Sequence, residues 1–225
     1  MSVTSTLRAA ALGLTCLAFA ACSKTEGNEI NATSIAKNIL KGRKKAAKPD
    51  VNAVAVAAAN ILATTDKAAI LISLPKRDLL SVVQEIETNR GYITFGSPDR
   101  RSITLKNGML TATRGLGNDV LSSDIGGVHA LISARHEGAA QRAMRYLDGE
   151  NLTVEMTPFC QIKLGKTTHV SIGEINSPAQ IVLESCIADH TTFQNTYHVA
   201  PNGRILQSQQ WHSPFNDYIV LQALR

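Results

Sequence analysis

The spacing of apolar and polar residues changes character once along the chain. Before Gly91, apolar residues form continuous runs or recur at helical intervals, whereas beyond Gly91 they alternate with polar residues. A period near 3.6 predicts helices, and a period of two predicts strands that bury one face. The chain is therefore predicted to place short helices ahead of a larger β region.

Two segments before Gly91 carry the helical pattern. The Ala-rich segment 51–63 predicts a helix, although Val54 and Val56 alternate. In segment 78–88 the apolar residues lie on one side of a helix, which would begin after Pro75 with Asp78 as its N-cap. Both are predicted as short helices attached to the β region.

Beyond Gly91, the alternating stretches are rich in β-branched residues, which favours strands. They are residues 92–95, 101–105, 109–113, 152–156, 169–172 and 180–184. Segment 139–147 carries helix-forming residues but directly precedes a turn sequence, Asp148-Gly149, so it is also predicted as a strand.

Three dipeptides have the chemistry of two-residue hairpin turns: Asn107-Gly108, Asp148-Gly149 and Asn202-Gly203. Such turns need positive φ angles, which Asn, Asp and Gly tolerate. The gaps between strands leave little room for the crossover helices of a parallel sheet. The predicted fold is mainly β: a large antiparallel meander sheet folded on itself, barrel- or sandwich-like, with a few short N-terminal helices.

The N-terminus has the pattern of a signal peptide. Arg8 precedes an apolar run, 9–21, that is too short to span a bilayer and has the length of a signal-peptide core. Small residues then precede Cys22, as in bacterial lipoproteins whose cysteine is acylated. Phe19 replaces the usual Leu, so ordinary cleavage after Ala20 is the alternative. Ser23, rather than Asp, favours the outer membrane, with the protein on its periplasmic face.

The predicted domains are a lipoprotein signal peptide at 1–21, a lipid anchor with a tether and a basic, Ala-rich helical segment at 22–67, and a single antiparallel β domain at 68–225. The stretch 41–48 is rich in Lys and Arg. It could contact acidic lipid or polysaccharide, or it could be a solvated helix face beside a linker.

After removal of the signal peptide and acylation of Cys22, only Cys160 and Cys186 remain. In an oxidising periplasm two such cysteines usually pair. A disulfide between these residues, which are 26 positions apart, would stabilise the fold by about 3 kcal/mol. Two unpaired buried thiols are the alternative. Since no CxxC motif or histidine cluster accompanies them, neither a redox site nor a metal site is predicted.

Chemical motifs are scarce in this sequence. Gly115-Leu116-Gly117 could begin a phosphate-binding loop, but Val120 occupies the position of the third glycine and no amphipathic helix follows. This segment is therefore predicted as a glycine-bearing bend or bulge. No nucleophile elbow is present, and Glu174 and Glu184 would act as paired catalytic carboxylates only at a suitable separation. No catalytic residue and no cofactor are predicted.

Aromatic residues near the C-terminus raise the possibility of glycan contact. Trp211, Phe215 and Tyr218 could pack on sugar rings, although aromatics are only 4% of the chain and a lone Trp in a strand is more often part of the core. The formal net charge of +5 would suit an acidic glycan. Arg114, Arg204 and Trp211 are the candidate contact residues for a glycan or a protein partner.

Several stretches together resemble the YjbF/GfcB-type lipoproteins, which are encoded with exopolysaccharide and group 4 capsule genes. The matching stretches are 105–108, 113–119, 146–149, Cys160, Cys186, 195–199, 203–211 and Pro214. The resemblance covers about residues 68–215, and Gln209 departs from the Arg expected at that position. It implies an antiparallel meander sheet on an outer-membrane lipid anchor, and it brings no catalytic residues.

Three hypotheses on function follow. The first is a non-enzymatic accessory or scaffold in exopolysaccharide or capsule production and export, which binds an envelope protein such as an outer-membrane β-barrel. The second is a direct binder of acidic polysaccharide. The third, which the absence of catalytic motifs disfavours, is a glycan-modifying enzyme. No nucleic-acid partner is predicted.

Overall fold

Strands dominate the structure, as the period of two predicts. The protein is described by a computed structural model that covers residues 48–148 and 150–225. The strands are β1 (Ala69–Leu74), β2 (Leu79–Asn89), β3 (Tyr92–Gly96), β4 (Ser102–Lys106), β5 (Met109–Arg114), β6 (Val120–Asp124), β7 (Gly138–Gln141), β8 (Ala143–Leu147), β9 (Thr153–Met156), β10 (Phe159–Ile172), β11 (Ile175–Ala188), β12 (Thr191–Val199), β13 (Ile205–Ser213) and β14 (Asp217–Ala223). The helices are α2 (Val51–Thr64), the 3-10 turn η1 (Pro75–Arg77) and α3 (Gly126–Ala134).

The large sheet joins two antiparallel meanders. Its strand order is β5-β4-β3-β2-β1-β14-β13-β12-β11-β10-β7, so pairing of β1 with β14 connects the N-terminal and C-terminal meanders. The strands at its two ends, β5 and β7, do not pair with each other, and the sheet is therefore not closed into a barrel. A smaller sheet has the order β6-β8-β9. The predicted fold class is confirmed, in its sandwich-like form.

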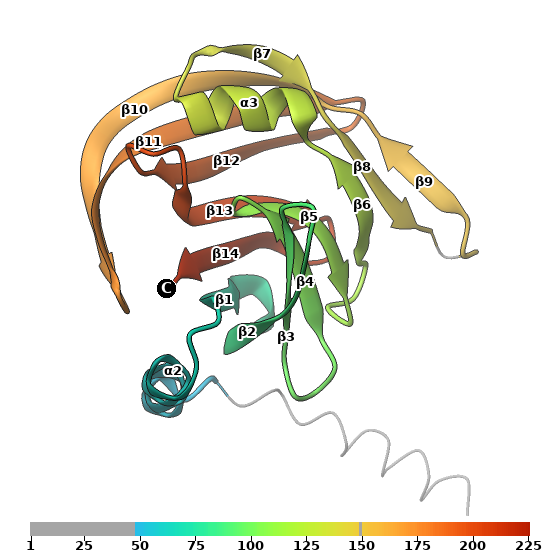
Figure 1. The fold of residues 1–225 in the computed structure, drawn as a ribbon. Helices are drawn as coiled ribbons and strands as arrows, with labels where there is room; N and C mark the ends of the chain where they lie inside the picture. Colours follow the sequence, from blue (N-terminus) through green and yellow to red (C-terminus); the bar gives the residue numbers. More distant parts are fainter. Residues whose placement is uncertain (1–47, 149) are drawn as a thin grey trace, which may run out of the picture. The chain divides into compact units, whose positions relative to one another are not determined.

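The large sheet is curled so that β5, at one edge, lies against β13 in the middle of the same sheet. The backbone N–H of Leu110 on β5 donates a hydrogen bond of 2.9 Å to Gln210 Oε1 on β13. Helix α3 lies along β10 to β12 (Figure 1) and buries Val128 and Ile132. The main core fills the space between these layers, with residues such as Ile103 and Tyr197 fully or almost fully buried.

The predicted helix at 51–63 is confirmed as α2. Asp50 caps it by accepting hydrogen bonds from the backbone N–H groups of Asn52 and Ala53. Its apolar residues, Val54, Ala58, Ile61 and Leu62, pack against Ala69, Val82 and Leu224 of the β region. Among the described residues, no helix combines the length and apolarity needed to cross a bilayer.

The predicted helix at 78–88 is wrong, because this segment forms strand β2. Val83 faces the main core, whereas Val82, on the opposite face, packs under α2. A strand covered on both faces carries apolar residues on both sides, and this mimics the helical spacing. Asp78 does not cap a helix N-terminus but ends η1 with a positive φ of 47°.

The six predicted strands and the segment 139–147 coincide with strands of the structure, except that Arg101 and Leu152 directly precede β4 and β9. Segment 139–147 is divided into β7 and β8, with Arg142 between them. The hairpin at Asn107-Gly108 is confirmed, with φ of 46° and 83°. Asn202-Gly203 lies in the turn between β12 and β13, and Asp148 in the turn between β8 and β9, where Gly149 is outside the described residues.

Helix α3 is absent from the sequence predictions. It begins with two glycines and without a side-chain cap, so the usual signals of a helix start are missing. The spacing of Val128, Leu131 and Ile132 is nevertheless helical, and this spacing could have predicted α3.

Candidate functional site

Buried polar side chains connect β5 to β13 across the curl of the sheet. Gln210 is almost completely buried; its amide donates to the carbonyl of Gly108 at 2.8 Å and its Oε1 accepts from the N–H of Leu110. This amide therefore satisfies the backbone of β5, which lies at the edge of the sheet. We call Thr113, Asp119, Gln210, His212 and Asn216 the β5–β13 cluster.

His212 is the centre of the second half of the β5–β13 cluster. Its Nε2 lies 3.1 Å from Thr113 Oγ1, which itself donates to Asp119 at 2.8 Å, so Nε2 must carry the proton. Its Nδ1 is left to accept from the Ser213 hydroxyl at 2.9 Å. Burial lowers the pKa of His212 to about 4, although Asp119 opposes this shift, and the imidazole is neutral at pH 7.

The segment Gly115-Leu116-Gly117 forms the bend between β5 and β6 that its glycines predict. Both glycines have φ of 80°. Asp119 closes the bend by accepting from the N–H groups of Gly115 at 2.8 Å and Leu116 at 3.0 Å. A Cβ atom on Gly117 would lie 3.0 Å from Phe215 Cε1, so a larger residue would displace that ring.

A surface cavity of about 300 Å³ opens beside this bend. Its lining combines leucines, arginines, backbone of the bend and one aromatic ring: Leu74, Arg77, Leu79, Arg101, Gly115, Leu116, Gly117 and Phe215. Asn216 of the β5–β13 cluster holds the bend from below by donating to the carbonyls of Leu116 and Gly117, at 3.2 and 2.7 Å. The cavity wall is thus fixed by buried hydrogen bonds.

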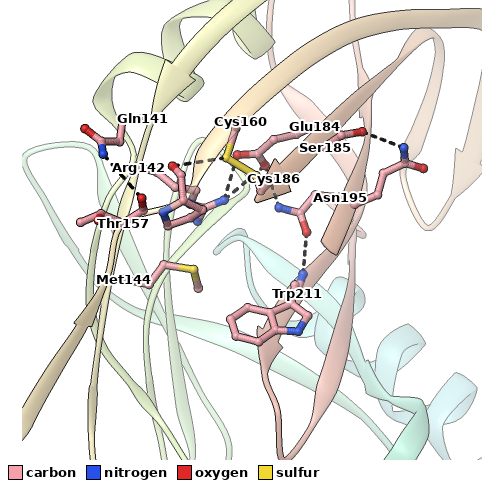
Figure 2. The surroundings of a disulfide bond; sticks show 12 residues. Gln141, Arg142, Met144, Thr157, Cys160, Glu184, Ser185, Cys186, Asn195 and Trp211 are labelled. Atoms are coloured by element: carbon pink, nitrogen blue, oxygen red, sulfur yellow. Dashed lines mark hydrogen bonds and ion pairs between the residues drawn. A yellow bond between two sulfur atoms is a disulfide. The ribbon is translucent and has the colours of Figure 1, made fainter. Parts of the chain in front are cut away.

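A second buried polar group lies under β10 to β12, and we call it the ion-pair cluster (Figure 2). Arg142 Nη1 lies 3.2 Å from both carboxylate oxygens of Glu184, and both side chains are almost wholly buried. Asn195 and Tyr197 each donate to Glu184 Oε2 at 2.7 Å. Ser123 accepts from Arg142 Nη2 at 3.3 Å and completes the cluster.

The electrostatics of the ion-pair cluster keep Arg142 charged and Tyr197 neutral. Burial by itself would lower the pKa of Arg142, but Glu184 reverses this effect and the pKa is raised. Burial raises the pKa of Tyr197 well above its ordinary value, and Glu184 adds to the increase. Since the carboxylate is enclosed by these donors, it is not available to a substrate.

The predicted disulfide between Cys160 and Cys186 is confirmed. It joins residues that face each other in the pairing of β10 with β11, next to Glu184 (Figure 2). The two sulfurs and a Glu184 oxygen lie within 4.8 Å of one another, but the sulfurs are bonded together and are not thiolate ligands.

Trp211 is a core residue, and this corrects its predicted role as a contact residue. It is 8% exposed, its ring stacks on Phe193 at a centroid distance of 4.8 Å, and Tyr146 meets it edge-on at 6.3 Å. Phe215, in contrast, is 53% exposed. The buried indole offers no free face to a sugar ring.

Arg114 and Arg204 are exposed but lie at opposite ends of β5. Arg114 is the last residue of β5 and donates to the carbonyls of Thr113 and Val120, so it helps to hold the β5–β6 bend. Arg204 donates to the carbonyl of Arg225 and lines a cavity of about 150 Å³ beside Gly108. At the rise of a strand, β5 separates them by about 20 Å. The role of Arg114 and Arg204 as contact residues stays a prediction.

The predicted lipidation site, Cys22, lies outside the described residues.

Sequence patterns did not reveal Arg77, Arg101 or the partnership of Arg142 with Glu184. Glu184 and Glu174 do not form a catalytic pair, because Glu184 is buried and Glu174 is exposed in an ion pair with Arg225. Phe215, in contrast, belongs to the sequence predictions as one of three C-terminal aromatic residues that could pack on sugar rings. No local motif joins these residues, since they come from distant segments.

The chain matches the family model described as group 4 capsule polysaccharide lipoprotein GfcB, YjbF, over residues 32–224. The chain belongs to the YjbF family. The fold is similar to the crystal structure of the hypothetical lipoprotein YmcC from Escherichia coli K12, with a TM-score of 0.66 and 16% sequence identity. That match covers 88% of this chain and 98% of YmcC. No curated protein matches the sequence.

The stretches that resemble the YjbF family meet in the structure. Asn107 donates to the carbonyl of Gly203 at 2.9 Å, and Gln210, in the stretch 203–211, reaches β5 by donating to the carbonyl of Gly108. The family signature therefore contains the residues that hold the curl of the sheet and shape the bend beside the cavity of about 300 Å³.

Proposed function

We propose that this protein is an outer-membrane lipoprotein on the periplasmic face that acts as a non-enzymatic accessory or scaffold in capsule or exopolysaccharide production and export. The family match over residues 32–224 carries this proposal. The lipoprotein-type sequence before Cys22 supports the anchor and the address.

The non-enzymatic role is supported by how the reactive groups are held. Ser213 contacts His212 but is completely buried. Ser133 lies 3.3 Å from His129 on α3, and among the described residues no carboxylate hydrogen-bonds to this histidine. A nucleophile of this kind needs an accessible hydroxyl and an oriented base. Neither pair meets both requirements.

A scaffold needs surface for a protein partner, and exposed apolar side chains offer it. Phe159 on β10 and Ile187 on β11 face each other in the sheet register and are 59% and 66% exposed. Leu152 and Val154 at the β8–β9 hairpin are also exposed. Exposed large apolar groups beside one another are typical of protein-binding surfaces. The proposed partner is another envelope protein of the secretion system, such as an outer-membrane β-barrel.

The decisive experiment is deletion of the gene followed by measurement of the amount and chain length of extracellular polysaccharide under inducing conditions. We expect less polysaccharide or altered chain lengths, with restoration by the wild-type gene. Unchanged amount and length would refute the accessory role. Sensitivity of processing to globomycin tests the acylation of Cys22 separately.

Crosslinking in cells, followed by identification of the attached protein, tests the scaffold. We expect Phe159→Ala to reduce the crosslinked product, because it removes an exposed apolar group from the proposed surface. Phe215→Ala, which removes an exposed Phe elsewhere, is the matched control. Equal yields from wild type and Phe159→Ala would exclude this surface.

A further inference from the structure

The cavity beside the β5–β6 bend has the composition of a small ligand site. Leu74, Leu79 and Leu116 supply apolar lining, and Arg77 and Arg101 supply positive charge. Its volume of about 300 Å³ is at the lower end of the range for small-molecule pockets. The polar part of its exposed lining is slightly larger than the apolar part, which suits a polar or charged ligand better than an apolar one.

Arg77 is positioned by neutral groups. Its Nη1 donates to the carbonyl of Leu116 at 3.1 Å and to Asn216 Oδ1 at 3.3 Å. Within residues 48–148 and 150–225, no carboxylate forms an ion pair with Arg77. Its guanidinium is therefore oriented by the bend while its charge remains available to an anion.

Arg101 is only weakly engaged. It forms an ion pair of 3.1 Å with Asp99, and both side chains are largely exposed, at 41% and 56%. Exposed pairs of this kind contribute little free energy, so a ligand carboxylate can replace Asp99. Of the other acids near this cavity, Asp217 is paired with Lys76 at 3.0 Å and Asp119 accepts hydrogen bonds from the bend. Asp78, between the lining residues Arg77 and Leu79 in the sequence, is exposed and forms no ion pair within the described residues.

Phe215 places an exposed aromatic ring next to this charge. The Arg77 guanidinium lies 4.9 Å from the centre of the Phe215 ring, and the missing side chain at Gly117 leaves room for both. Aromatic faces pack on the apolar face of a sugar ring, whereas a bare anion makes no use of them. The combination favours a cyclic ligand that carries a carboxylate.

We propose that this cavity binds a carboxylated sugar residue of an acidic polysaccharide, with Phe215 against the ring and Arg77 and Arg101 on the carboxylate. The nature of the ligand as polysaccharide rests on the proposed function, whereas the site itself rests on the geometry. Arg114 supports the bend beside the site, and Trp211 and Arg204 lie outside it.

The test is calorimetric titration of the full chain in detergent at low ionic strength. The probes are an oligoglucuronate, a neutral glucose oligosaccharide of equal length, and acetate. We expect the oligoglucuronate to bind, with affinity that falls as salt screens the arginines, and we expect neither the neutral sugar nor acetate to bind comparably. Absence of oligoglucuronate binding, or equal binding of the neutral sugar, would overturn the proposal.

Matched variants locate the site. Arg77→Gln and Arg101→Gln should each weaken oligoglucuronate binding about tenfold, and Phe215→Ala about three- to tenfold. Arg90→Gln removes the same charge from the exposed turn between β2 and β3, and Phe159→Ala removes a similarly exposed Phe from another surface. Both controls should bind as wild type does. If the controls lose as much affinity as the site variants, the proposal is wrong.

Arg77 contacts the bend, so its variant must also be checked for folding by thermal unfolding. Phe215→Ala and Arg101→Gln remove no hydrogen bond to the bend and keep the test valid if Arg77→Gln is unstable. The titration measures binding alone and the gene deletion measures polysaccharide alone. Failure of the site and failure of the accessory role are therefore distinguishable.

Discussion

The two buried polar clusters differ in charge and in where they end. The ion-pair cluster encloses Arg142 and Glu184 completely and lies beside a disulfide. The β5–β13 cluster uses a neutral histidine, amide groups and the carboxylate of Asp119, and it continues to the bend that borders a surface cavity. A buried ion pair that does not reach the surface supports the fold, even though Arg142 Nε lacks a hydrogen-bond partner among the described residues, whereas a largely uncharged network that reaches the surface can also shape a site.

The largest expected effect is on the ion-pair cluster. Glu184→Ala leaves Arg142 buried without its counter-charge and should lower the free energy of unfolding by about 3–5 kcal/mol. Glu155→Ala breaks the exposed pair with Arg145 and should cost at most about 1 kcal/mol. Urea denaturation compares the two variants. Similar losses would mean that the buried ion pair is no more important to stability than the exposed one.

Reduction of the disulfide should have the next largest effect. Opening the disulfide removes the link between two residues that are 26 positions apart, so the unfolded chain gains conformational freedom. The free energy of unfolding should fall by about 3 kcal/mol. The measurement is the urea midpoint with and without reductant. The double variant Cys160→Ala, Cys186→Ala should be as stable as the reduced protein, and a response of that variant to reductant would contradict this interpretation.

Acidification tests the β5–β13 cluster. Because the pKa of His212 is about 4 in the folded protein and ordinary in the unfolded chain, the unfolded state binds more protons between these values. The stability contributed by neutral His212 is complete above the ordinary pKa and declines as pH falls toward 4. Between pH 7 and pH 5 the expected loss is about 2 kcal/mol.

Denaturation of wild type and His212→Gln at both pH values measures this contribution. His129 and His198 also have pKa values lowered by burial, so the variant should keep a smaller dependence of the same sign. An equal pH dependence in both proteins would show that His212 is not the group responsible.

The smallest effect on stability is expected at the cavity. Phe215→Ala should change the free energy of unfolding by no more than about 0.5 kcal/mol, because the ring is largely exposed. Trp211→Ala, four positions earlier in the sequence, should cost about 3–5 kcal/mol because that ring is in the core. Thermal unfolding distinguishes them, and a large loss from Phe215→Ala would make the ring structural.

Local sequence features predicted most of the β architecture. The hairpin at Asn107-Gly108 and the bend at Gly115 and Gly117 depend on positive φ angles, which the nearest residues determine. The β2 segment was mistaken for a helix because α2 and the core cover its two faces. Its environment, rather than its own sequence, decided that outcome.

The candidate site could be anticipated only in part. The sequence drew attention to the segment 114–117 and to Phe215, but it also favoured Trp211, and exposure of a ring cannot be read from its identity. Arg77 and Arg101 carry no motif, and they meet Phe215 only because the sheet curls and brings η1, β4 and the β13–β14 turn to one cavity.

By itself, the sequence determined the alternation of strands, the positions of the turns, the lipoprotein-type N-terminus and the resemblance to the family, because each depends on neighbouring residues or on matching stretches. The tertiary structure alone decided which arginines are enclosed and which remain open to an anion. Burial and charge pairing arise from residues far apart in the chain. Arg142 is neutralised by Glu184, whereas Arg77 is held by neutral groups beside a cavity.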